Sequence, residues 1–136
     1  MRVFLDTNVL VSAFATRGLS ADLLELVSLE HELLTGDSVL REFEKALRLK
    51  LKVPASRCAE AADSISSEAV LVARDAEPAD CDADEDDRRV LGEALAAGAD
   101  ALVTGDSALV ALGAVGSMRI VTPRQLWELL RKGDQK

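Results

Sequence analysis

Residues 2–8 read RVFLDTN, a short apolar run that stops at a polar turn. A run of this length that ends in Asp, Thr and Asn is typical of a buried strand followed by a turn. Residues 101–107, ALVTGDS, show the same pattern, because a second apolar run there ends in Thr-Gly-Asp. Ligands of open parallel sheets collect at the carboxyl ends of the strands. We therefore expect Asp6 and Asp106 to lie at the same edge of a sheet.

The rest of the chain alternates short apolar runs with stretches of helical periodicity. This pattern predicts further strands at 32–35, 69–73 and 118–121, helices at 9–14, 20–27, 38–50, 55–67, 88–97 and 123–130, a short helix after 107 and an acidic loop at 75–87. Such alternation predicts an α/β fold with a mostly parallel sheet, because each parallel pairing requires a crossover. The length predicts a single domain over 1–136.

Helical spacing also predicts which side chains face the core. In the helix at 88–97 these are Val90, Leu91, Ala94 and Leu95, with Gly98 just past its end. In the helix at 38–50 the apolar face includes the aliphatic stem of Lys50.

The composition describes an acidic chain with a core of small aliphatic side chains. Hydrophobic residues make up 49% of the 136 residues and aromatic residues only 3%, and the formal net charge is −8. A charge of this sign repels nucleic acid, so a polyanionic substrate would need metal ions or a local basic strip. Two separated cysteines, no signal-like segment and no apolar stretch of about 20 residues predict a cytoplasmic protein that does not enter a membrane.

Four acidic residues are candidates for a metal site: Asp6, Glu42, Asp87 and Asp106. Glu42 lies at the rim of the buried face of its helix, and Asp87 lies near a helix N-terminus, which favours a carboxylate. Converging carboxylates repel each other by roughly 4 kcal/mol per pair at about 4 Å, so a fold that gathers them requires a cation. Oxygen ligands favour Mg²⁺ or Mn²⁺ over zinc. Such ions can activate water and stabilise the leaving oxygen of a phosphodiester.

Each candidate also has a simpler structural interpretation. Asp6 and Asp106 can cap the helices that follow them. Glu42 can be a solvated helix position, and His31, the single histidine, is expected to be a turn residue. Basic residues on and just after the helix at 38–50, and just after the acidic loop, can meet RNA phosphates or form a solvated face. They are Arg41, Lys45, Arg48, Lys50, Lys52, Arg88 and Arg89.

Four segments, in chain order, resemble the PIN domain family over nearly the whole chain. They are residues 4–10 (FLDTNVL), 38–42 (SVLRE), 84–94 (with Asp84, Asp87, Val90, Leu91 and Ala94) and 99–106 (ADALVTGD). The resemblance is greatest to bacterial toxin components of toxin–antitoxin systems of the VapC type. It implies an α/β/α sandwich of three layers and metal-dependent endoribonuclease activity on single-stranded or structured RNA. It also implies a homodimer and a cognate antitoxin that inhibits the toxin.

The resemblance also assigns roles to residues. It matches Asp6, Glu42, Asp87 and Asp106 to the acidic quartet of the family, and Asn8 and Thr104 to supporting polar positions. Asp84 matches an accessory acid. Many relatives have an aspartate where this chain has Arg88, so a shifted register would replace Asp87 by Asp86.

Two alternative functions remain open from the sequence. One is a PIN-like module with weak or lost catalysis that binds RNA or protein. The other is a phosphoryl-transfer domain of the haloacid dehalogenase type with Asp6 as nucleophile. That family uses a second aspartate two residues later, where this chain has Asn8.

Overall fold

Six strands form one sheet in the order β3-β2-β1-β4-β6-β5 in the computed structural model, which describes residues 1–134. All neighbouring strands pair in parallel except β5 and β6, which are antiparallel. The strands are β1 (Arg2–Leu5), β2 (Glu32–Gly36), β3 (Leu71–Ala73), β4 (Ala101–Val103), β5 (Ala114–Val115) and β6 (Met118–Val121). The predicted mostly parallel sheet is confirmed.

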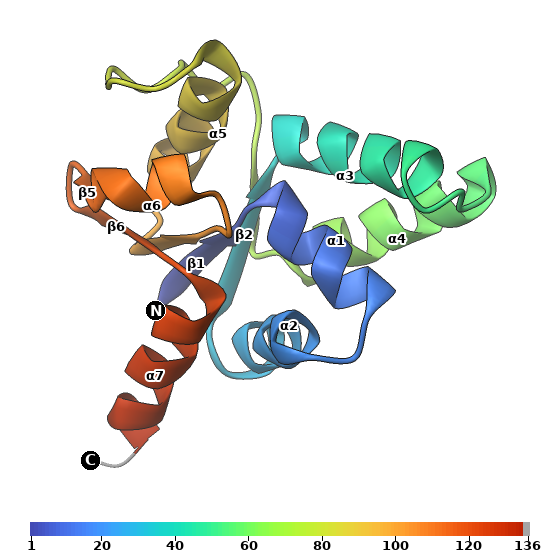
Figure 1. Cartoon of the computed structure of the whole chain (residues 1–136), viewed down its shortest axis with the longest axis horizontal. Helices are drawn as coiled ribbons and strands as arrows, with labels where there is room; N and C mark the ends of the chain where they lie inside the picture. The colour runs from blue at the N-terminus through green and yellow to red at the C-terminus, as the bar shows by residue number, and fades with distance from the viewer. Residues whose placement is uncertain (135–136) are drawn as a thin grey trace.

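Helices cover both faces of this sheet. In Figure 1, α1, α3 and α4 lie on one side of it, whereas α5 and α6 lie on the other, which gives the three-layer α/β/α architecture. The helices are α1 (Thr7–Ala15), α2 (Leu19–Glu30), α3 (Asp37–Leu49), α4 (Ala55–Glu68), α5 (Glu85–Ala96), α6 (Ser107–Leu112) and α7 (Pro123–Asp134). Within the described residues, none of these helices is long and apolar enough to cross a membrane.

The central strands are buried because both faces are covered. Val3, Phe4 and Leu5 of β1 and Leu102 and Val103 of β4 are fully buried. Such continuous apolar runs are expected for parallel strands between two helical layers. They belong to one continuous hydrophobic cluster that joins the sheet to its helices.

The register of β1 and β4 determines where the candidate site lies. Leu5 pairs with Val103, so the residues that follow the two strands leave the sheet side by side. The amide of Asp6 donates to the carbonyl of Val103 at 2.9 Å, and the amide of Thr104 donates to the carbonyl of Val121 at 3.0 Å. The carboxyl ends of β1, β4 and β6 therefore form one edge.

The structure corrects the predictions for α5 and for the helix face that carries Lys50. Helix α5 begins at Glu85 rather than residue 88, because the carboxylate of Asp84 accepts the amide of Asp87 at 2.8 Å and caps the helix. Leu95 is 37% exposed, whereas Glu93 is buried in its place. Lys50 is exposed at the end of α3 and does not face the core.

Two further differences concern an additional strand and the end of the last helix. The strand β5 was not predicted; it forms a hairpin with β6 through the two residues Gly116 and Ser117. Gly116 has φ +59, a conformation that glycine adopts without strain and that two-residue hairpin turns require. Helix α7 continues to Asp134, past the predicted end at 130.

Candidate active site

A hydrogen-bonded triad joins the ends of β1 and β4. The hydroxyl of Thr104 donates to Oδ2 of Asp6 at 2.7 Å and accepts the amide of Asp106 at 3.1 Å. Oδ1 of Asp6 accepts the amide of Thr7 at 2.8 Å, so Asp6 also caps α1. Thr104 is fully buried and Asp6 is only 9% exposed. The side chain of Asp6 is therefore held in one orientation by neutral donors.

Asp106 begins the short helix α6. Its Oδ1 accepts the amides of Ala108 at 2.8 Å and Leu109 at 3.4 Å, which is an N-cap arrangement. Asn8 supports the same loop, because its Oδ1 accepts the amide of Gly105 at 3.3 Å. The predicted capping role of Asp6 and Asp106 is thus correct. Capping uses only part of each carboxylate, so Oδ2 of Asp106 and further lone pairs of Asp6 can still bind a ligand.

A hollow of about 280 Å³ opens beside Asp6 at this edge. Glu42 of α3 and Asp87 of α5 reach it from two different helices, so three of the four predicted acids share one hollow. Asp106 does not line it. The full lining is Asp6, Thr7, Ser38, Arg41, Glu42, Asp86, Asp87, Arg89 and Val90.

The carboxylates at this edge influence each other. Burial, and then the nearby carboxylates of Asp84, Asp106, Asp6 and Asp86, raise the pKa of Asp87 from 3.8 to about 6. Burial also raises the pKa of Asp6 and is the largest cause of its shift. The hydrogen bonds from Thr104 and Thr7 lower this pKa, whereas the carboxylate of Asp106 raises it further. All four of these neighbours of Asp87 therefore contribute to one negative field.

The chemistry of the donor set bears on whether a metal ion fits. Within the described residues, no three Asp, Glu, His or Cys side chains lie close enough together to hold a metal ion as they stand. The side chains that could ligate an ion nevertheless suit a hard divalent cation, because they are the carboxylates of Asp and Glu and the hydroxyls of Thr7 and Ser38. Arg41 and Arg89 are the cations of the hollow. Glu42 is an exposed helical side chain and Asp87 is half-buried, so both can rotate toward Asp6.

The accessory acids take different positions. Asp84 caps α5, and its carboxylate raises the pKa of Asp87. Asp86 lines the hollow together with Asp87. Arg88 points elsewhere, because its Nε donates to the carbonyl of Ala79 at 2.7 Å. Asp87 therefore remains the candidate in this segment, with Asp86 beside it.

Sequence reasoning missed Glu93, a buried carboxylate behind this edge. Glu93 is 4% exposed, and its Oε2 accepts the amide of Ser38 at 2.9 Å. Its Oε1 has no hydrogen-bond partner within the described residues. This contact ties α5, which carries Asp87, to the first turn of α3, which carries Glu42. Helical spacing gave no signal for Glu93, because a residue two positions after Leu91 is expected on a different face of α5.

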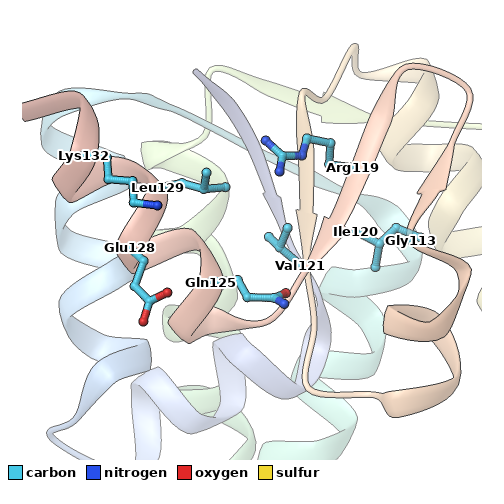
Figure 2. A pocket seen from close by; sticks show the side chains of 8 residues that line it. All are labelled: Gly113, Arg119, Ile120, Val121, Gln125, Glu128, Leu129 and Lys132. Carbon is cyan, nitrogen blue, oxygen red and sulfur yellow. The ribbon is translucent and has the colours of Figure 1, made fainter.

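Another hollow on the surface, formed by α7 and β6, shares no residue with the acidic one. Figure 2 shows this hollow, which is lined by Gln125, Glu128, Leu129 and Lys132 of α7 and by Arg119 of β6, among others. It lies between α7 and β6 and lacks any of the predicted acids. His31 ends α2 and lies 3.5 Å from the N-terminal amine through its Nδ1, as expected for a turn residue.

The chain belongs to the PIN domain family, whose model matches residues 2–108. The family resemblance seen in the sequence is thereby confirmed. No curated protein matches the chain in sequence.

Two solved structures share the fold. One is VapBC2 from Rickettsia felis bound to a DNA fragment from its promoter, with a TM-score of 0.64 and 16% identity over 90% of this chain and 98% of that chain. The other is VapC20 from Mycobacterium tuberculosis, a toxin that cleaves the sarcin-ricin loop, with a TM-score of 0.57 and 18% identity over 86% of this chain and 98% of that chain. At these identities the likeness is one of fold.

Proposed function

We propose that the chain is a metal-dependent endoribonuclease and the toxin component of a toxin–antitoxin pair. The observation that carries this proposal is the hollow at the carboxyl edge of the sheet, which Asp6, Glu42 and Asp87 line together. Asp106 lies outside the hollow, but its carboxylate adds to the field that raises the pKa of Asp87. Membership of the PIN domain family supports the activity.

Asp6, Glu42, Asp87 and Asp106 are the proposed ligands of Mg²⁺ or Mn²⁺. Asp6 is the fixed member, because Thr104 and Thr7 hold its side chain in place. Glu42 and Asp87 approach from helices and complete the set by rotation of their side chains. A divalent ion bound there would neutralise the carboxylates and stabilise negative charge on a phosphodiester.

The protein residues have separate roles in the proposed hydrolysis. Arg41 and Arg89 line the hollow and can pair with phosphate oxygens of the RNA. Asp87 can accept a proton from the attacking water through a carboxylate oxygen that does not hold the ion. A bond then forms between the water oxygen and phosphorus, a P–O ester bond breaks, and the proton passes to the leaving oxygen.

The proposed partners follow from the same family. The Rickettsia felis structure contains VapBC2 together with a DNA fragment from their promoter, which supports a cognate antitoxin for this chain. The Mycobacterium tuberculosis toxin cleaves the sarcin-ricin loop, which supports RNA as substrate. A cytoplasmic homodimer is proposed from the family resemblance.

Cleavage of labelled RNA tests the proposal. Purified protein should cut RNA with Mn²⁺ or Mg²⁺ and not with EDTA, and Asp6→Asn should lower the rate at least about 100-fold, the size of loss seen when one group that stabilises transition-state charge is removed. Glu77→Gln is the matched control, because this acidic residue lies outside the hollow. RNA binding without cleavage would instead favour the non-catalytic module. Phospho-aspartate trapping tests the phosphatase alternative, which the family match does not support.

A further inference from the structure

A second hollow continues from the acidic one along helices α1 and α3. Its volume is about 360 Å³. The two hollows share Asp6 and Thr7, so they adjoin each other, and we call the pair the α1–α3 trough. The second hollow is lined by Asp6, Thr7, Asn8, Val11, Ser12, Ala46 and Lys50.

One stripe of α3 forms a wall of the whole trough. Ser38 and Glu42 line the acidic hollow, and Ala46 and Lys50 line the second one. These four residues are spaced four apart, so they lie on one face of the helix. From Glu42 to Lys50 the helix rises about 12 Å, at about 1.5 Å per residue. The trough therefore extends past the position of a single phosphate at the acidic end.

The charge and polarity of the trough change along its length. The acidic end holds Asp6 and Glu42, whereas the far end holds the ammonium group of Lys50. Between them the walls are aliphatic at Val11 and Ala46. Apolar walls with a cation at the end suit a base and a backbone phosphate better than they suit a second metal ion.

Helix α1 also carries an exposed aromatic residue, Phe14, which itself lines neither hollow. Phe14 follows Val11 by three residues, so it lies on the same face of α1 one turn farther on. Its ring packs edge-on against Phe43 of α3, with centroids 6.4 Å apart and an interplanar angle of 82°. The residue is nevertheless 48% exposed. Part of the ring is thus fixed between the two helices and part is free to stack on a base.

We propose that the α1–α3 trough binds a stretch of single-stranded RNA beside the scissile phosphodiester. In this arrangement Lys50 pairs with a backbone phosphate and Phe14 stacks on a base. The inference rests on the proposed ribonuclease function, since it needs an RNA strand in the acidic hollow. An RNA strand is favoured over a peptide, because a polyanion that extends from the metal site along the trough meets the ammonium group of Lys50 at the far end.

Equilibrium binding tests the trough without requiring cleavage. A fluorescein-labelled single-stranded RNA is titrated with the full chain in Ca²⁺, and anisotropy is recorded over a series of salt concentrations. Lys50→Gln should weaken binding and reduce the slope of log K against log salt by about 0.7, the value expected for one lost phosphate contact with a single strand. Lys45→Gln is the matched control, because Lys45 is an equally exposed cation of α3 that lines neither hollow.

A second pair of variants tests stacking. Phe14→Ala should weaken binding about fivefold or more, whereas Phe14→Tyr, which keeps the aromatic face, should bind like the wild type. Circular dichroism of each variant checks that the fold is intact. If Phe14→Ala is unfolded, the Lys50→Gln result decides the proposal alone.

The outcomes separate this proposal from the ribonuclease itself. If Lys50→Gln leaves the affinity and the salt slope unchanged, or changes them no more than Lys45→Gln does, the proposal that the trough binds RNA is wrong, even if the chain cleaves RNA. This is also the result expected if a peptide occupies the trough. RNA binding that depends on Lys50, without any cleavage in Mn²⁺ or Mg²⁺, would support RNA binding in the trough and contradict the proposed ribonuclease activity.

Discussion

Thr104 donates a hydrogen bond of 2.7 Å from its buried hydroxyl to Oδ2 of Asp6. The hydroxyl oxygen of Thr104 also accepts the amide of Asp106 at 3.1 Å, so one hydroxyl connects the ends of the two central strands. A buried carboxylate without such a donor would be costly, because a charged group loses the hydration that it had in water. Thr104 therefore makes the burial of Asp6 possible.

Replacement of Thr104 tests this role. Thr104→Val removes the hydroxyl at nearly constant volume and should lower the free energy of unfolding at neutral pH by about 1.5–3 kcal/mol, the range for hydrogen bonds to charged groups. Urea unfolding measures the loss, which should shrink at acid pH as Asp6 takes up a proton. Thr104→Ser, which keeps the hydroxyl, should lose much less. Equal stability of the Val and Ser variants would contradict the role.

The raised pKa of Asp87 predicts a dependence of stability on pH. The folded protein binds this proton at about pH 6, whereas the unfolded chain binds it near the ordinary value of 3.8. Between these values the folded state holds more protons, so lowering the pH through this window stabilises the fold and raising it through about 6 removes that stability.

The variant Asp87→Asn isolates this contribution. Its side chain does not titrate, so it should be more stable than the wild type at about pH 7.5, and the difference should fall at about pH 5. Urea unfolding in EDTA at both pH values gives the comparison. Asp82→Asn is a control on the preceding loop, at an exposed position outside the hollow. Parallel pH curves for Asp87→Asn and the wild type would argue against a shared carboxylate field.

The positions of Asp6 and Asp106 could be predicted from the sequence because they depend on strand ends. The end of an apolar run indicates where a strand ends, and parallel pairing then brings the carboxyl ends of both strands to one edge of the sheet. Asp87 was predicted near a helix N-terminus, but the helix start was placed three residues late. The signal for the true start was an aspartate at 84 followed by an acid three residues later, a pattern close to the capping box.

Glu93 could not be predicted because helical periodicity assigns acidic residues to the solvent face. The sequence favoured Leu95 for the core, yet the structure exposes Leu95 and buries Glu93. The reason is a contact between helices: the amide of Ser38 on α3 provides a partner for the Glu93 carboxylate. Such a pairing over 55 residues of sequence leaves no local pattern. The same holds for the trough, which depends on how α1 packs beside α3.

Divalent ions should stabilise the fold if the four acids bind them. A ligand that binds only the folded state adds about 2.7 kcal/mol at a concentration 100 times its dissociation constant. Differential scanning fluorimetry should therefore show a rise in Tm with Mn²⁺ or Mg²⁺ at about pH 7.5, and a smaller one at about pH 5, where Asp87 is protonated. Asp6→Asn and Glu42→Gln should each reduce the rise.

A control variant separates site binding from general ion effects. Glu44 lies on α3 two residues after Glu42 and does not line the hollow. Glu44→Gln should therefore respond to Mn²⁺ like the wild type. An equal loss in Glu42→Gln and Glu44→Gln would mean that the ion acts on the surface charge of the helix. Within the described residues no three acids lie at ligating distance, so this experiment is the direct test of side-chain rotation.

Gly36 and Glu93 should be energetically coupled. Gly36 has an extended backbone at φ −152, so its conformation does not require glycine. A Cβ there would overlap the carboxyl group of Glu93 and come within 3.0 Å of the Glu93 Cβ. Gly36→Ala should therefore lower the free energy of unfolding by about 1–3 kcal/mol, as overpacked cores do.

A double-mutant cycle measures this coupling. Glu93→Ala removes the overlapping carboxyl group, so the double variant should be less destabilised than the sum of the two single variants, by about 0.5–3 kcal/mol. Urea unfolding of the four proteins gives the interaction energy. Gly105→Ala paired with Glu93→Ala is the control cycle, because a Cβ at Gly105 meets only the Asn8 side chain at 3.9 Å and should add independently of Glu93. Additive losses in the first cycle would show that α5 and α3 move apart to admit the methyl group, and that Glu93 does not fix the distance between the helices that carry Glu42 and Asp87.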